Sequence, residues 1–306
     1  MSGAALENIF LLVMCMAVGF IARKGKVLKA GDMPGLVALI LDITLPALLI
    51  MAMQREFEVE AFRGSLVVMG LAIMINIVAL AIALLITKAM KVTGAERAVL
   101  ILGLVFPNMG FMGIPLIYAM YGQEAMLYTA MANSVANVVV PTVGIAILLG
   151  AGSRSQIKLK SVLLNKIILA TIIGFALFVF SVQIPELIGN GLSMIGGATT
   201  PLSMIIIGSM LGENDLKGVF LGWKIYIVAL FRLIVFPLMV FVVLSRFVED
   251  RSAITILTTL TAMPVAAITA ILAAEHDKEP QLASKVVFIT TVLSIATIPL
   301  MLMIVG

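Results

Sequence analysis

Two apolar segments interrupted by proline hold the residue types best suited to chemistry in this chain. The first reads FPNMGFMGIP over residues 106–115, and the second contains Met263-Pro264. Proline removes a backbone donor and breaks a helix, while Gly110 and Gly113 add conformational freedom. Unwound backbone at membrane depth is tolerated only where it is buried in protein or lines a cavity. Matched interruptions in the two halves of a chain therefore indicate a substrate site.

The chemistry expected at such breaks is the binding of an anion. The half-helix after each break begins with unpaired N–H groups and a partial positive charge, which suit a carboxylate. The side-chain amide of Asn108 can donate to the same oxygens. We expect the substrate site to be lined by Pro107, Asn108, Gly110, Gly113, Met263 and Pro264. The simpler alternative is that these prolines only kink helices whose neighbours satisfy the freed carbonyls.

Four further polar residues within apolar stretches are candidates for the site. Asn133 and Asn137 lie four apart, hence on one helical face, and either complete the pocket or bond across helices. Asp42 and Arg232 are ionisable residues inside apolar stretches, where an unpaired charge is costly. For these two, coupling of a proton, structural pairing and exposure to a water-filled vestibule all remain open.

The elements that must position these residues are membrane-spanning helices. Hydrophobic residues make up 62% of the 306 positions and charged residues only 12%, far from the composition of soluble domains. The length needed to cross a hydrocarbon core of about 30 Å is reached by ten apolar stretches. They are Ala4–Ala22, Gly35–Met53, Leu66–Thr87, Ala98–Tyr121, Ala125–Leu149, Val162–Val182, Leu192–Leu211, Val219–Leu244, Ser252–Ala274 and Leu282–Val305.

The basic residues predict the orientation of these spans. Loops on one side carry fourteen: Arg23, Lys24, Lys26, Lys29, Lys88, Lys91, Arg97, Arg154, Lys158, Lys160, Lys217, Lys224, Lys278 and Lys285. Loops on the opposite side carry four: Arg55, Arg63, Arg246 and Arg251. Because positive loops stay in the cytoplasm, we expect a multi-pass protein of the cytoplasmic membrane with both termini outside the cytoplasm.

Three pairs of prolines predict an internal repeat. Pro46 with Pro201, Pro107 with Pro264, and Pro141 with Pro299 share nearly one offset along the chain. Five spans per half is an odd number, so the second half enters the membrane from the opposite face. We therefore expect two inverted five-helix repeats, 1–150 and 162–306, joined by a cytoplasmic loop over 151–161.

Several classes of function are disfavoured by what the chain holds. Its one His and one Cys, with no paired carboxylates inside the spans, argue against intramembrane hydrolysis, and no metal or cofactor is expected. The net charge of +4 is spread over short loops and not gathered on a stripe, so nucleic acid is not an expected partner. We expect the partners to be the lipid bilayer and a small anionic substrate.

The motifs of the fourth and ninth stretches resemble those of the auxin efflux carrier family, which includes plant PIN-type carriers and bacterial malonate and malate permeases. The likeness extends over essentially the whole chain. It rests on FPNMGFMGIPL at 106–116, Tyr121-Gly122, Thr200-Pro201-Leu202 with Gly208, Arg232 with Pro237, AMPV at 262–265, AAEHD at 273–277, Pro280 and Ser284. The family's sixth span often opens with Asn-Pro, whereas this chain has Asn165-Lys166, which puts a site role for Asn165 in doubt.

The resemblance implies an all-α fold like that of the bile-acid sodium symporter superfamily. It has ten helices in two inverted repeats, with helices four and nine broken and crossing. Helices one, two, six and seven would form a scaffold, through which a homodimer is implied. Helices three to five and eight to ten would form the moving transport domain. The chain lacks the long cytoplasmic loop of the plant carriers, which favours a microbial metabolite carrier over a hormone carrier.

Three functions follow from these patterns. The leading expectation is a secondary transporter of small mono- or dicarboxylates, working by elevator-like alternating access at the crossing of helices four and nine. The alternative is a sodium-coupled organic-anion symporter of bile-acid type, although spans three, four, five and nine lack a midplane carboxylate. A receptor without transport is the remote third. The sequence does not name the carboxylate, the coupling ion or the direction of flux.

Overall fold

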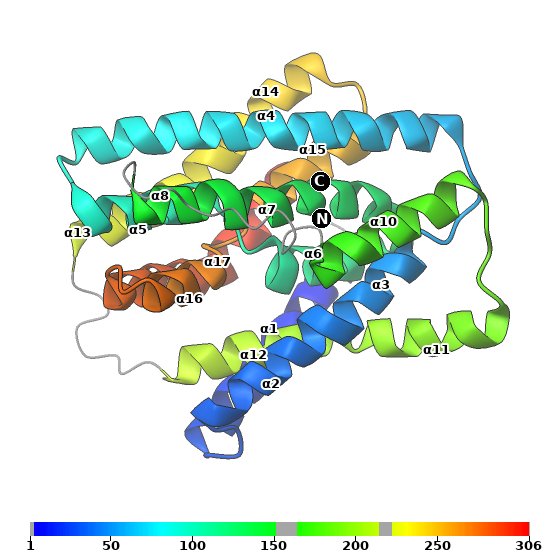
Figure 1. Ribbon diagram of the computed structural model, residues 1–306, viewed down its shortest axis with the longest axis horizontal. Helices are drawn as coiled ribbons and strands as arrows, with labels where there is room; N and C mark the ends of the chain where they lie inside the picture. The colour runs from blue at the N-terminus through cyan, green and yellow to red at the C-terminus, as the bar shows by residue number, and fades with distance from the viewer. Residues whose placement is uncertain (1–2, 151–163, 214–221, 306) are drawn as a thin grey trace. The chain divides into compact units, whose positions relative to one another are not determined.

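A computed structural model describes residues 3–150, 164–213 and 222–305, and in these residues every regular element is a helix (Figure 1). The predicted junction loop over 151–161 therefore lies outside the described residues. Six helical stretches are long and apolar enough to cross a membrane by length and composition: Met33–Ala52, Val59–Ala89, Gln123–Leu149, Glu186–Gly212, Trp223–Phe247 and Pro280–Val305. Each of the ten predicted stretches overlaps one or more helices. The protein is thus an all-α membrane protein, and the count of ten spans stays a prediction.

Contacts between residues divide the chain into two compact units, each taking segments from both halves of the sequence. Unit 1 comprises Met1–Met69, Gly110–Ser134 and Leu159–Asn214, and unit 2 comprises Gly70–Met109, Val135–Lys158 and Asp215–Gly306. The boundaries pass through the long helix α4 (Val59–Ala89), through the fourth predicted span and through α7 (Met126–Val139). The inverted repeat is a different division of the chain, and it stays a prediction.

Unit 1 is built around two close helix pairings. Its further helices are α1 (Gly3–Lys24), η1 (Ala30–Asp32), α2 (Met33–Leu39), η2 (Ile40–Thr44), α3 (Leu45–Ala52), α6 (Ile114–Tyr121), η4 (Gln123–Ala125), α10 (Lys166–Val179), α11 (Glu186–Gly197) and α12 (Thr199–Glu213). Helix α1 runs beside α12, and α3 packs between α10 and α11 (Figure 1). The seventh predicted span, Leu192–Leu211, is divided between α11 and α12 at Ala198, where a Cβ on Gly196 would lie 2.8 Å from the backbone of Leu48.

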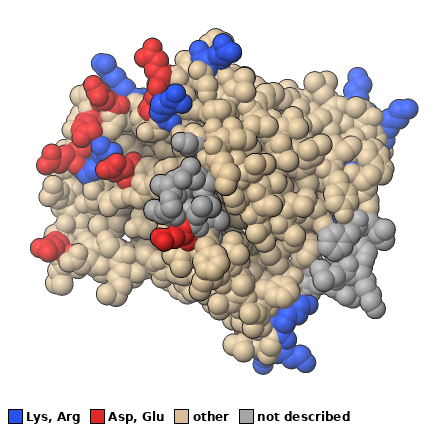
Figure 2. Space-filling view, turned by 180° about the vertical axis from the view of Figure 1, so that it is seen from behind, with Lys and Arg blue, Asp and Glu red and all other residues tan. Residues whose placement is uncertain are grey.

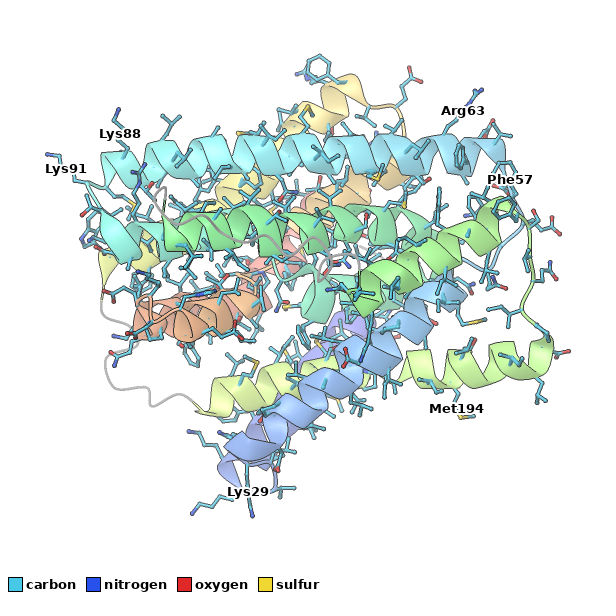
Figure 3. All side chains as sticks on the ribbon, viewed as in Figure 1. Lys29, Phe57, Arg63, Lys88, Lys91 and Met194 are labelled. Carbon is cyan, nitrogen blue, oxygen red and sulfur yellow. The ribbon has the colours of Figure 1, made fainter. Side chains whose placement is uncertain are left out.

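Aromatic side chains hold one end of unit 1 together. The rings of Phe57 and Phe178 lie 5.4 Å apart, those of Phe62 and Phe175 lie 5.8 Å apart and are stacked, and Phe178 is fully buried. These contacts join the start of α4 to the end of α10, and Phe57 is labelled at that end of α4 in Figure 3. Offset and tilted ring pairs of this kind stabilise beyond the area they bury.

Unit 2 packs its helices around α5 (Gly94–Val105). Its further helices are η5 (Val140–Gly144), α8 (Ile145–Leu149), α13 (Trp223–Leu230), η6 (Phe231–Val235), α14 (Phe236–Phe247), α15 (Arg251–Thr261), α16 (Ile268–Glu275) and α17 (Pro280–Val305). Helix α5 contacts α8, α13, α16 and α17, and every residue of α5 from Ala98 to Val105 is buried. This buried helix ends directly at the first proline break.

Wide π-helical turns accompany several of the prolines. The turns η2, η3 (Met109–Gly113) and η6 each end two residues before a proline, at Pro46, Pro115 and Pro237, and η5 contains Pro141. A proline cannot donate to the carbonyl one turn earlier, so the helix opens locally before it. Prolines other than the two at the breaks therefore also mark irregular backbone in the sequence.

The surface agrees with a membrane location. In the face shown in Figure 2, charged side chains gather mostly near the edges of the view, and uncharged residues make up most of its centre. Large apolar side chains are exposed on many helices, among them Leu187 and Met194 of α11, whose exposed fractions are 87% and 82%. Hydrocarbon is the medium in which such side chains are stable when exposed.

Candidate functional site

The two predicted breaks are present and lie against each other in unit 2. Helix α5 ends at Val105 and is followed by extended backbone at Phe106, while α15 ends at Thr261 and α16 begins only at Ile268. Pro107 lies antiparallel to Val265. The N–H of Asn108 donates to the Pro264 carbonyl at 2.8 Å, and the N–H of Ala266 donates to the Phe106 carbonyl at 3.0 Å. Helices four and nine are therefore broken, and their links cross.

The prolines explain why this short ladder stops after two bonds. Pro264 has no N–H and cannot return a bond to the carbonyl of Asn108, while the N–H of Phe106 donates to the Leu102 carbonyl within its own helix at 2.9 Å. The N–H of Val265, which is not used in the ladder, donates to the hydroxyl of Thr290 in α17 at 3.2 Å. Thr290 is fully buried and its hydroxyl also donates to the Val286 carbonyl at 2.8 Å. A side chain from a third helix thus accepts the hydrogen bond of the Val265 N–H, which the ladder does not use.

Arg232 caps the carboxyl-terminal ends of the two half-helices that precede the breaks. Its guanidinium donates to the carbonyls of Thr261 at 2.7 Å and Met263 at 3.2 Å, and to that of Leu104 at 3.2 Å. The last carbonyls of a helix lack partners within it and carry partial negative charge, so a cation there is favourable. Arg232 is fully buried. Of the roles left open for this residue, these contacts favour the structural one.

The charge of Arg232 has no carboxylate partner among the described residues. Its hydrogen bonds go to main-chain carbonyls, and the ring of Phe236 lies 5.7 Å from the guanidinium carbon. Neutral dipoles stabilise a buried cation but do not cancel its charge. The crossing therefore carries one formal positive charge.

Hydrogen-bond donors remain available where α16 begins, after the break in the ninth predicted span. The described residues offer no acceptor to the N–H groups of Ala267 and Ile268, which begin α16. The side-chain amide of Asn108 likewise makes no hydrogen bond within the described part of the chain, although the residue is only 5% exposed. Donors at a helix start, next to a buried cation, form an arrangement that suits an anion.

The other predicted site residues are distributed over both units. Pro107, Asn108, Asn137, Met263 and Pro264 belong to unit 2, whereas Gly110, Gly113 and Asn133 belong to unit 1. Within unit 2 the structure brings together Pro107, Asn108, Met263, Pro264 and Arg232. Asn133 is buried and Asn137 is half-buried, and their roles in the site stay predictions.

Asp42 belongs to η2 of unit 1, where its carboxylate pairs with the ammonium of Lys166 at 2.7 Å. The neighbouring Asn165 caps α10: its side-chain oxygen accepts from the N–H groups of Ile167 at 2.9 Å and Ile168 at 3.3 Å. This cap gives Asn165 a local structural role, whereas the sequence left its part in the site in doubt.

A cavity of about 350 Å³ lies at the opposite end of α5 from the break. It is bordered by the first turns of α5, α13 and α17, and by the ion pair of Lys224 with Glu96, whose atoms are 2.6 Å apart. The described residues contain no group of three or more His, Cys, Asp or Glu side chains that could hold a metal ion. The expectation that no cofactor is bound stays a prediction.

Two functional contacts were outside the reach of sequence reasoning. Thr290 as the acceptor for Val265 and Lys166 as the partner of Asp42 both come from helices distant in the chain. Neither residue stands in a recognisable motif. The only available signal was that Asp42 and the proline link each needed a partner.

Comparison with known proteins places the chain in a family. Its sequence matches the family described as membrane transport protein over residues 4–302. It is 25% identical to an uncharacterized transporter of Methanocaldococcus jannaschii, over 96% of this chain and 97% of the relative. It is 22% identical to an uncharacterized transporter of Methanothermobacter thermautotrophicus, over 96% of each chain. With broken, crossing helices four and nine and a match over nearly its whole length, the chain belongs to this membrane transport protein family, that of the auxin efflux carriers.

Proposed function

We propose that this transporter carries small organic anions, mono- or dicarboxylates, across the cytoplasmic membrane. The observation that carries the proposal is the positive character of the crossing: a buried guanidinium without a carboxylate partner in the described residues, beside N–H and amide donors that are not used. An organic cation would be repelled there, and a neutral solute would leave the charge uncompensated.

The size of this preference can be bounded by Coulomb's law. A carboxylate about 8 Å from the guanidinium gains roughly 2 kcal/mol at an effective dielectric constant of about 20. That energy corresponds to a preference of about 30-fold over a neutral solute of the same shape. Donation from Asn108 and from the start of α16 would add direct hydrogen bonds to the carboxylate oxygens.

Elevator-like movement is the mechanism that we propose for the carrier. In support, the main-chain ladder of the crossing and its contacts with Arg232 all lie within one compact unit, so the crossing can move with that unit as a whole. A site fastened inside one rigid body can be carried across the membrane without being dismantled.

Transport by purified protein in proteoliposomes tests this function. We expect uptake of labelled malonate or malate, with no uptake of the uncharged diamide malonamide or of choline. Asn108→Ala should reduce carboxylate uptake at least tenfold. The matched control is Asn76→Ala, since Asn76 is also buried but donates to Ala72 in its own helix at 2.8 Å. Equal uptake of the diamide, or equal loss in both variants, would contradict the proposal.

The same assay separates the sodium-coupled alternative. Buried hydroxyl oxygens of Thr258, Thr259 and Thr269, for which the described residues provide no hydrogen-bond partner, are available near the break in helix nine as uncharged cation ligands. Replacing external sodium by choline leaves flux unchanged in an uncoupled or proton-coupled carrier and abolishes it in a sodium symporter. We expect the flux to be unchanged, because α15 contains no Asp or Glu and α16 contains only Glu275, at its end.

A further inference from the structure

The Asp42–Lys166 pair lies in unit 1, near the middle of a helical stretch that is long enough to cross a membrane. Asp42 is the tenth residue of the 20-residue helical stretch Met33–Ala52, so it is about 14 Å from either end at about 1.5 Å per residue. Lys166 is held at the same level, because its ammonium nitrogen is 2.7 Å from the Asp42 carboxylate. Both members of an ion pair are thus placed near the centre of a hydrocarbon layer.

A helix also begins beside the ion pair. Helix α10 starts at Lys166, its first turn is capped by Asn165, and its 14 residues span only about 21 Å of the roughly 30 Å of the core. It packs against α3 and η2, which fixes its first turn beside Asp42. The capped first turn of α10 and the two charges therefore lie close together in unit 1.

These charges are not sealed within unit 1. The exposed fractions of the Lys166 and Asp42 side chains are 57% and 43%. Each charged residue at the centre of a membrane helix costs about 2.5–3.5 kcal/mol when it faces lipid. Elsewhere on α10 the exposed side chains are apolar, as at Ile172 and Ile173, whose exposed fractions are 55% and 49%. The pair is therefore a polar spot on a helix that otherwise suits hydrocarbon.

We propose that the face of unit 1 around Asp42 and Lys166 lies against water at mid-membrane depth and is a surface that the transported anion contacts. This inference rests on the proposed function for the identity of the anion. Asp42 holds the ammonium of Lys166 in place, and an arriving carboxylate meets that ammonium together with the positive end of α10. Lys166 is then a residue that positions the substrate on unit 1.

Cysteine accessibility tests the hydration of this face. The chain has one cysteine, Cys15, so Cys15→Ser gives a background for Lys166→Cys, Asp42→Cys and, as the control, Ile172→Cys. In proteoliposomes with reagent on both sides, we expect a charged thiosulfonate to label the first two at least tenfold faster than Ile172→Cys. Saturating malonate should slow that labelling. Labelling of both sites as slow as that of the control would overturn the proposal, whether lipid or a second copy covers them.

Transport by charge variants tests this contact. Lys166→Gln should raise the KM for malonate at least fivefold with little change in kcat, and Lys166→Arg should restore it. An unchanged KM in Lys166→Gln would overturn the inference even if the site is hydrated. Failure of the proposed function is distinguishable: it appears as absent carboxylate flux with the labelling contrast retained, whereas failure of this inference appears as flux without the contrast.

Discussion

Asn108 donates its backbone N–H to the carbonyl oxygen of Pro264 across 2.8 Å, so the broken segments of helices four and nine are joined by main chain. A main-chain bond does not depend on the identity of either side chain. The amide of Asn108 is thereby left available for a ligand, while the backbone of the same residue holds the crossing together. Substitutions at the crossing should consequently separate into those that affect the ligand and those that affect the fold.

Arg232→Met should destabilise the protein by about 3 kcal/mol or more. Methionine fills most of the volume but leaves the carbonyls of Leu104, Thr261 and Met263 without a buried donor, and each bond to a charged group is worth roughly 1.5–3 kcal/mol. Arg232→Lys should recover only part of the loss, because one ammonium cannot reach carbonyls of two helices. Thermal unfolding in detergent measures both. A Lys variant as stable as the wild type would contradict the capping role.

Thr290→Val should loosen the link between α15 and α16. The isosteric change removes the acceptor of the Val265 N–H and leaves a buried donor unsatisfied, which costs about 1–3 kcal/mol. Thr291→Val is the matched control, since that hydroxyl only donates to the carbonyl of its own helix at 2.7 Å. Hydrogen exchange at residues 265–268 should accelerate in the first variant and stay unchanged in the second. Equal acceleration in both would show that Thr290 has no special part.

The sequence predicted the breaks and their crossing because proline acts locally: Pro107 and Pro264 interrupt a helix in any environment, and their similar positions in the two halves indicated a shared site. The π-helical turn before Pro46, in contrast, had no sequence signal of its own. What satisfies the interrupted backbone is decided by tertiary packing. Arg232 was recognised as a charge that is costly to bury without a partner. Its carbonyl acceptors on α5 and α15, however, depend on the packing that brings the ends of those helices to it.

The division of the seventh span at Ala198 was missed for a similar reason. Residues 192–211 are apolar enough on average to predict one helix, whereas α11 ends at Gly197 and α12 begins at Thr199, beside the close approach of Gly196 to the backbone of Leu48. Hydropathy measures what the membrane accepts and is insensitive to a close approach of two backbones. Unit boundaries inside α4 and α7 were also beyond reach, since nothing in the composition of those helices changes there.

Gly208→Ala should disrupt the pairing of α1 with α12. A Cβ at Gly208 would collide with the carbonyl oxygen of Met16, so the two helices must separate. Overpacking of this kind costs about 1–3 kcal/mol or more, whereas Gly191→Ala in α11 meets nothing within 4 Å and should be neutral or slightly stabilising. Folded yield and melting temperature distinguish the two variants. If both melt alike, the backbones of α1 and α12 are not in the close contact described.

The orientation of the chain can be tested on α4 alone. This helix has 31 residues and is about 46 Å long, so both ends extend beyond a hydrocarbon core of about 30 Å. Arg63 lies near one end and Lys88 near the other (Figure 3), and both side chains are exposed. The excess of basic residues in the loops on the Lys88 side predicts that this end is cytoplasmic.

In the Cys15→Ser background, Arg63→Cys should therefore react in intact cells with a thiol reagent that does not cross membranes, and Lys88→Cys should react only after the cells are lysed. Equal labelling of the two after lysis serves as the control for accessibility. The reverse pattern in intact cells would place both termini in the cytoplasm. Because a helix of this length has its two ends in different aqueous compartments, one labelled and one protected cysteine are enough to assign the direction of α4.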